Sequence, residues 1–70
     1  MNKVLKINKK YGEWFYKKEK DYDMEFAVYY VYGKDANGVE DNWSSPSFEE
    51  IRNFCKLNKD DREKYKRIYG

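Results

Sequence analysis

The chain has 70 residues and a formal net charge of +2, and 40% of its residues are hydrophobic, 20% aromatic and 40% charged. A chain of this length forms one small domain, expected over residues 1–70, and buries only about 60% of the surface that its unfolded form exposes. It has no histidine and one cysteine, Cys55, so an internal disulfide is excluded and both the usual general base and the commonest metal ligand are missing. We therefore expect a protein that is not an enzyme and that has no metal site and no cofactor.

The apolar segments are short throughout the sequence. The amino-terminal segment, Met1 to Ile7, is too short in its apolar part for a signal peptide, and no apolar run approaches the length that spans a membrane. We expect a cytoplasmic protein that does not associate with membranes.

Charge is segregated along the chain. Residues 1–20 hold seven lysines and two glutamates, residues 21–50 hold eight acidic residues and one lysine, and residues 51–70 hold seven basic and three acidic residues. The ends are therefore basic and the middle is acidic. This pattern predicts either ion pairing within the fold or a surface with two signs of charge.

The first half of the chain reads as strands. Alternation predicts a first strand over about residues 3–8, a turn at 9–12 and an aromatic second strand over 13–17. A third strand is expected over 22–32, and a turn at Asp35–Gly38 leads to a short fourth strand, Val39–Trp43. We predict an α+β fold with a three- to four-stranded antiparallel meander sheet over about residues 3–43.

The third strand is expected to bury its even-numbered side chains. They are all apolar or aromatic, namely Tyr22, Met24, Phe26, Val28, Tyr30 and Tyr32. The odd-numbered Tyr29 and Val31 then lie on the opposite face and need a cover of their own.

One or two carboxy-terminal helices, over about residues 46–57 and 59–69, should pack on this sheet. The first begins near Pro46, capped either by Ser45 or by Ser47 with Glu50 in a capping box. Asn58 is expected to cap the second, whose apolar side chains could cover Tyr29 and Val31. These side chains are Tyr65, Ile68 and Tyr69.

The layout over roughly residues 13–57 resembles the arm-type DNA-binding domain of tyrosine integrases. Two strands, a turn ending in Gly38, a short strand and Ser45-Pro46-Ser47-Phe48-Glu49-Glu50 at a helix start carry the likeness. The resemblance implies a three-stranded sheet laid in the major groove. This chain departs from that pattern because the strands carry acidic residues that phosphates would repel, namely Glu25, Asp35, Glu40 and Asp41.

Protein binding accounts best for the surplus of aromatic residues. Eight Tyr and two Trp exceed what one small core can bury, and both types are enriched at binding hot spots. We predict an aromatic and acidic sheet surface that binds and occludes a protein, and a target that itself binds nucleic acid would present a basic groove to this surface. Its expected residues are Glu25, Tyr29, Val31, Glu40, Asp41 and Trp43.

Direct binding of DNA or RNA through the basic ends is the alternative prediction. Clusters of lysine and arginine near the two ends each contain a tyrosine that could stack on bases. The expected residues are Lys9, Lys10, Tyr11, Lys64, Tyr65 and Arg67.

Size, composition and the absence of catalytic motifs give a second resemblance. A short chain rich in Lys, Asn and Tyr is similar to the small inhibitors encoded by phages and mobile elements, the anti-CRISPR proteins among them. The resemblance implies stoichiometric occlusion of a host or defence protein.

Overall fold

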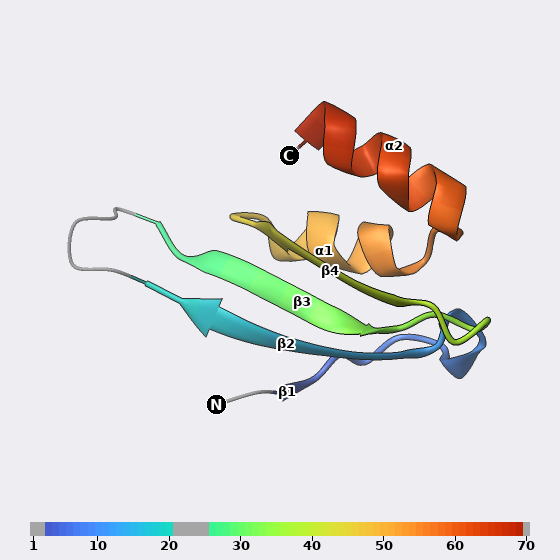
Figure 1. Cartoon of the computed structure of the whole chain (residues 1–70). Coiled ribbons are helices and arrows are strands. Elements are labelled where there is room, and N and C mark those ends of the chain that lie inside the picture. The colour runs from blue at the N-terminus through green and yellow to red at the C-terminus, as the bar shows by residue number, and fades with distance from the viewer. Residues whose placement is uncertain (1–2, 21–25, 70) are drawn as a thin grey trace.

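The structure, a computed structural model, describes residues 3–20 and 26–69. It contains a four-stranded antiparallel sheet followed by two helices (Figure 1). The elements are β1 (Lys3–Val4), the 3-10 helix η1 (Lys9–Tyr11), β2 (Glu13–Glu19), β3 (Val28–Lys34), β4 (Glu40–Ser45), α1 (Phe48–Cys55) and α2 (Lys59–Tyr69). The strands lie side by side in chain order, which confirms the predicted α+β meander.

Strand β1 is much shorter than predicted. The Leu5 amide still donates to the Trp14 carbonyl oxygen at 2.9 Å, but the Ile7 amide turns back to the Leu5 carbonyl oxygen and leaves the ladder. The Asn8 side chain then accepts a hydrogen bond from the Lys10 amide and starts η1. Gly12 ends η1 at φ +101°, and a Cβ there would lie 2.0 Å from the Lys34 carbonyl oxygen, so glycine is required.

The predicted face assignment of the third strand was wrong. Strand β3 starts at Val28, and Val31, which is fully buried, faces the core between Tyr16 on β2 and Trp43 on β4. Tyr30 and Tyr32 point to the opposite face and Phe26 is exposed, whereas Tyr22 and Met24 lie outside the described residues.

The turn between β3 and β4 explains why the odd-numbered side chains of β3 face the core. The Asp35 amide donates to the Val39 carbonyl oxygen, and the Gly38 amide donates to the Asp35 carbonyl oxygen, each at 3.0 Å. This closure pairs Lys34 with Glu40 and therefore Val31 with Trp43. Because directly paired residues share one face, burial of the Trp43 ring takes Val31 into the core with it.

Both helices begin at capping residues. Ser47, rather than Ser45, is the cap of α1, and its hydroxyl oxygen accepts from the Glu50 amide at 3.3 Å. The Ser45 hydroxyl oxygen instead accepts from the Ser47 amide and shapes the approach to the helix. Asn58 accepts from the Asp61 amide at 2.8 Å as predicted, so the carboxy-terminal segment forms two helices.

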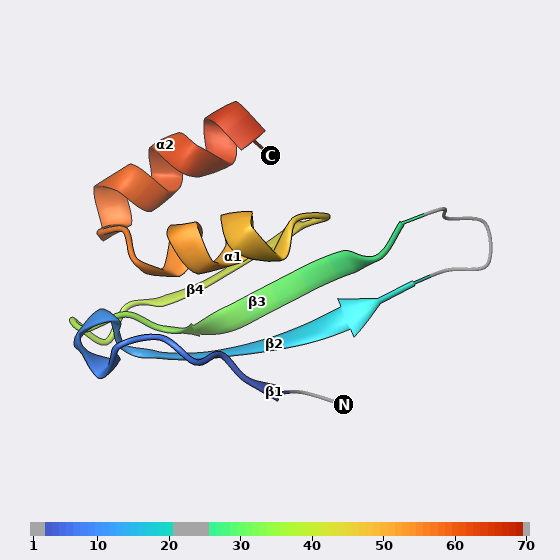
Figure 2. The same cartoon turned by 180° about the vertical axis from the view of Figure 1, so that it is seen from behind.

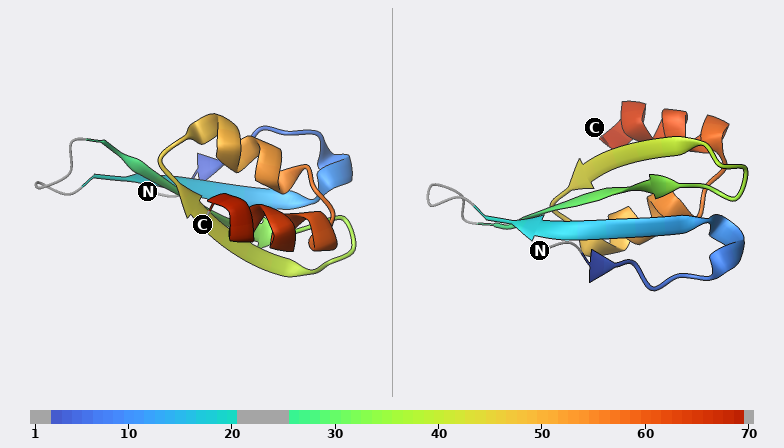
Figure 3. Two further views of the ribbon diagram at one scale, coloured as in Figure 1. Left: turned by 90° about the horizontal axis from the view of Figure 1, so that it is seen from above. Right: turned by 60° about the horizontal axis from the view of Figure 1, so that its bottom comes forward.

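Both helices lie on the same side of the sheet (Figures 2 and 3). Helix α1 packs on the strands, where the Phe54 ring stacks on Trp43 with centroids 5.1 Å apart and meets Trp14 edge-on. The buried core consists of Leu5, Trp14, Val31, Trp43, Ile51, Phe54 and Cys55. No helix in the described part of the chain is long and apolar enough to cross a membrane.

A buried arginine fastens α2 to this core. Arg62 is 0% exposed, and its guanidinium group donates to three acceptors on separate segments. These are the Asp41 carboxylate at 2.9 Å, the Asp35 carboxylate at 2.7 Å and the Leu57 carbonyl oxygen at 2.9 Å. The group also lies 5.6 Å from the centroid of the Trp14 ring. The acidic middle of the chain thus pairs with its basic end inside the fold.

The two carboxylates of this cluster have lowered pKa values. Hydrogen bonding from Arg62 lowers the pKa of Asp35. Burial alone would raise the pKa of Asp41, but hydrogen bonds from Lys66, at 2.5 Å, and from Arg62 outweigh it, so the pKa is lowered. Burial similarly opposes the charge on Arg62, and its hydrogen bonds to Asp35 and Asp41 raise the pKa of the guanidinium group.

We expect Arg62→Met to destabilise the protein by about 3–5 kcal/mol, because it removes the ion-pair partner of the nearly buried Asp35 carboxylate and one of the two partners of Asp41. A domain of this size has a free energy of unfolding of roughly 4–10 kcal/mol, so the variant should be close to unfolding. Urea denaturation followed by tryptophan fluorescence measures the loss. Lys64→Met, an exposed position on the same helix, is the control, and equal midpoints for the two variants would contradict this role of Arg62.

We expect stability to fall as the pH drops below about 4. The pKa values of Asp35 and Asp41 are below the ordinary 3.8, so their ion pairs are fully present at neutral pH and are lost as the pH falls through the folded-state values. Urea midpoints from neutral pH to about pH 2 test this expectation. Asp35→Asn should be less stable than the wild type at neutral pH and should lose less on acidification. Parallel pH profiles for the two proteins would show that the ion pair of Asp35 does not cause the loss of stability in acid.

Candidate functional site: the open face of the sheet

The sheet face away from the helices carries a row of aromatic side chains. Alternation along β2 and β3 places Phe15, Tyr30 and Tyr32 on this face, opposite to Trp14 and Val31. Figure 3, right, views this side with the strands in front of both helices. We call it the open face, because no described helix covers it.

The aromatic rings of the open face stack on one another. Phe15 and Tyr32 are directly paired across β2 and β3, with centroids 5.6 Å apart, and Tyr30 and Tyr32 are 5.9 Å apart. The Lys17 amino group lies 5.5 Å from the centre of the Tyr30 ring, and its hydrogen bond to Glu19 raises the pKa of Lys17. The three rings therefore form a continuous, partly exposed apolar strip.

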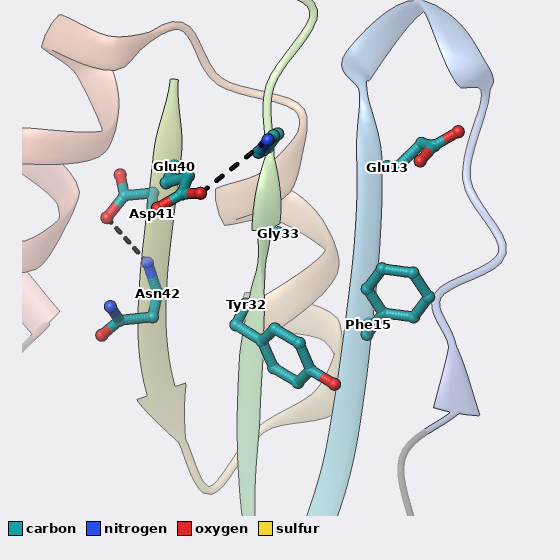
Figure 4. Close-up of a pocket in the computed structure, with 8 residues that line it drawn as sticks. Glu13, Phe15, Tyr32, Gly33, Glu40, Asp41 and Asn42 are labelled. Atoms are coloured by element: carbon teal, nitrogen blue, oxygen red, sulfur yellow. Dashed lines mark hydrogen bonds and ion pairs between the residues drawn. The ribbon is translucent and has the colours of Figure 1, made fainter. Parts of the chain in front are cut away.

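An open hollow lies at one end of this strip (Figure 4). Its described lining residues are Glu13, Phe15, Tyr32, Gly33, Lys34, Glu40, Asp41 and Asn42. Two rows of directly paired residues cross the strands here. One row is Glu13, Lys34 and Glu40, and the next is Phe15, Tyr32 and Asn42. Gly33 brings the strands together closely, since a Cβ there would lie 2.2 Å from the Glu13 carbonyl oxygen.

The chemistry of the hollow suits a basic side chain. The rings of Phe15 and Tyr32 offer faces that attract cations. Glu13 lies two residues before Phe15 on β2, and Glu40 lies on β4 beside the strand of Tyr32. Lys34 pairs with Glu40 at 3.8 Å, but the side chains of both are well exposed, at 62% and 80%. Such an ion pair contributes little to stability, so an incoming guanidinium or ammonium group can replace Lys34 at low cost.

Only part of the predicted protein-binding set is available on a surface. Val31 and Trp43, at 0% and 7% exposed, belong to the core, so their assignment to a binding surface was wrong. The Asp41 carboxylate is engaged by Arg62 and Lys66, and Tyr29 packs edge-on against Phe48 at 5.3 Å. Glu40 is exposed on the open face, and Glu25 lies outside the described residues.

The predicted nucleic-acid residues lie on two different elements. Lys9 and Lys10 are exposed on η1 beside the partly buried Tyr11. Lys64 and Arg67 are exposed on α2, where Asp60 and Glu63 precede them by one helical turn and offset their charge.

Tyr65 is engaged in packing and in a hydrogen bond within the fold. Its ring packs edge-on against Trp43 at 5.3 Å, and its hydroxyl group donates to the Glu50 carboxylate. The second stacking residue of that prediction is therefore part of the packing between α2 and the core.

Sequence reasoning missed Phe15, Tyr30 and Tyr32 as surface residues. The sequence signal that identifies them is the distance of Trp43, a large apolar side chain, from the turn at Asp35–Gly38. If Trp43 is placed in the core, the register set by the turn buries Val31 and exposes its neighbours Tyr30 and Tyr32. Tyrosine also suits a partly exposed face better than valine does, because its hydroxyl group can remain hydrated.

The described residues offer no evident nucleophile or metal ligand set. Burial raises the pKa of the Cys55 thiol to about 12, so it is not a thiolate at neutral pH. Within residues 3–20 and 26–69, no three His, Cys, Asp or Glu side chains gather as a metal site would require.

Comparison with known protein families, with curated proteins and with solved structures found no match.

We expect Val31→Ala to cost about 2 kcal/mol of stability, because it opens a cavity between Trp43 and α1. Tyr30→Thr on the adjacent open face should cost less than about 1 kcal/mol, since it loses mainly the contact with Tyr32. Urea denaturation of both variants measures the difference. A larger loss for Tyr30→Thr than for Val31→Ala would show that the two faces are exchanged.

Proposed function

We propose that this protein is a non-enzymatic binding module that occludes a protein target through the open face of its sheet. The observation that carries the proposal is the stacked strip of Phe15, Tyr32 and Tyr30 on a face that no described helix covers. Tyrosine and phenylalanine are enriched at the centre of protein interfaces, where they bury much area at little cost in side-chain entropy.

The carboxylates at the end of the strip indicate the chemistry of the target. Glu13 and Glu40 flank the aromatic hollow and favour a partner that presents an arginine or lysine side chain. Basic side chains line the grooves of proteins that bind nucleic acid. A cytoplasmic nucleic-acid enzyme of a host or of a defence system, occluded by a small phage-type inhibitor, is the target that fits this combination.

The shape of the molecule is compatible with such a role. The principal-axis extents of the molecule are 38, 26 and 17 Å, so it is flat and has a broad face. A stable interface needs about 800 Å² from each partner. A face of three to four strands can supply an area of that order without rearrangement of the fold.

We expect the double variant Tyr30→Ser/Tyr32→Ser to lose the partner that the wild-type protein binds. The immobilised protein is used to capture partners from host extract at low salt, and the captured species is then purified and its affinity measured directly. The double variant should bind at least about 100-fold more weakly, because it removes two central aromatic contacts. Glu40→Lys should weaken binding and reduce its dependence on salt.

Lys64→Gln on the exposed side of α2 is the control and should bind like the wild type. Well-dispersed amide spectra of all variants establish that they are folded. A folded double variant that retains wild-type affinity for the purified partner would refute the open face as the binding surface.

A further inference from the structure

A second surface feature lies on the helix side of the sheet, at the edge formed by β1. Two adjoining hollows share Lys3, Tyr16 and Phe48 and together form one cleft between α1 and strands β1 and β2. The other described lining residues are Val4, Lys6, Lys18, Tyr29 and Arg52. We call this the basic cleft, and it uses neither the open face nor the Arg62 cluster.

The charged side chains that line the basic cleft are all basic. Lys3 is the direct cross-strand partner of Tyr16, and Lys18 follows Tyr16 on the same face of β2. Arg52 lies one helical turn after Phe48 on α1, and Lys6 follows β1. Four cations from three segments thus surround one depression, a field that favours an anionic ligand.

Aromatic rings form the wall between these cations. Phe48 meets Tyr16 at 5.1 Å and Tyr29 at 5.3 Å, edge-on in both cases, and the Lys18 amino group lies 5.9 Å from the centre of the Tyr29 ring. Rings interleaved with basic side chains are the arrangement with which proteins hold nucleotides, since phosphate meets the cations and the base packs on the rings.

Arg52 supplies a separate indication of a ligand. Its Nε atom is buried, and no described residue accepts a hydrogen bond from it. Buried donors are almost always paired in native proteins, because an unpaired donor has lost its hydration without compensation. Because this atom is closed to solvent, a phosphate oxygen reaches it only when the Arg52 side chain turns toward the basic cleft, where the planar fork of arginine donors suits phosphate.

We propose that the basic cleft binds a nucleotide, with its phosphate held by Arg52, Lys3 and Lys6 and its base packed against the wall formed by Tyr16 and Phe48. The nucleotide is either free or part of a single strand, and the phosphate chemistry is the same in both cases. This site differs from the basic clusters on η1 and α2, which the cleft does not include.

The test is a titration of the isotope-labelled full chain, followed by NMR, at about 0.15 M salt, where weak surface attraction is largely screened. The probes are ATP, inorganic pyrophosphate and a single-stranded hexathymidylate. We expect saturable shifts of the amides of residues 3–6, 16–18 and 48–52 and of the Arg52 Nε–H resonance. Tighter binding of ATP assigns a free nucleotide, and tighter binding of the oligonucleotide assigns a single strand.

Matched variants distinguish binding in the basic cleft from non-specific electrostatic attraction to the protein. Lys6→Gln and Lys64→Gln remove the same charge from exposed positions, one inside the cleft and one on α2. Lys6→Gln should weaken ATP binding about tenfold, whereas Lys64→Gln should change it less than twofold. Arg52→Gln should weaken it at least as much as Lys6→Gln does.

Three results would overturn the proposal. The first is an Arg52 Nε–H resonance that stays in place while ATP and the oligonucleotide are raised to millimolar concentration. The second is equal weakening by Lys6→Gln and Lys64→Gln. The third is pyrophosphate binding as tightly as ATP, which would remove the base from the site and with it the assignment to a nucleotide.

Discussion

A guanidinium group that has no access to water needs acceptors within the protein, and Arg62 finds them on three segments, two of which lie more than 20 residues earlier in the chain. Asp35 lies at the β3–β4 turn, Asp41 on β4, and Leu57 in the link between the helices. Because these acceptors converge at one end of β4, they hold α2 on the side of the sheet that α1 already covers. The placement of α2 depends on this cluster, since Arg62 is the buried residue of that helix.

Two surfaces of different chemistry follow from placing both helices on one side. The open face is left to the stacked rings of Phe15, Tyr32 and Tyr30, with acidic side chains beside them. At the β1 edge on the other side, α1 meets a concentration of lysines and forms the basic cleft. The acidic middle of the chain is therefore divided between two environments, because Asp35 and Asp41 are paired inside the fold while Glu40 is exposed.

The order of the elements was predictable from the sequence because turn and capping residues act locally. Asp35–Gly38, Ser47 and Asn58 all perform their expected roles through hydrogen bonds to residues within four positions. The buried face of β3 was not predictable from its own alternation, because aromatic residues occupy both faces and only pairing with Trp43 separates them. Burial of Arg62 has no local signal either, since its two carboxylate partners lie more than 20 residues earlier in the chain. The burial of Val31 and Trp43, which were predicted on a binding surface, likewise depends on pairing between strands and not on local alternation.

Solvent exposure of each face, measured by NMR with a soluble paramagnetic probe, tests this account most directly. We expect strong broadening of the ring protons of Phe15, Tyr30 and Tyr32. The Val31 methyl groups, the Trp43 ring and the Arg62 Nε–H should be protected, since these groups are buried between the sheet and the helices. Protected Tyr30 and Tyr32 rings together with broadened Val31 methyl groups would contradict it, because the helices would then cover the face that we describe as open.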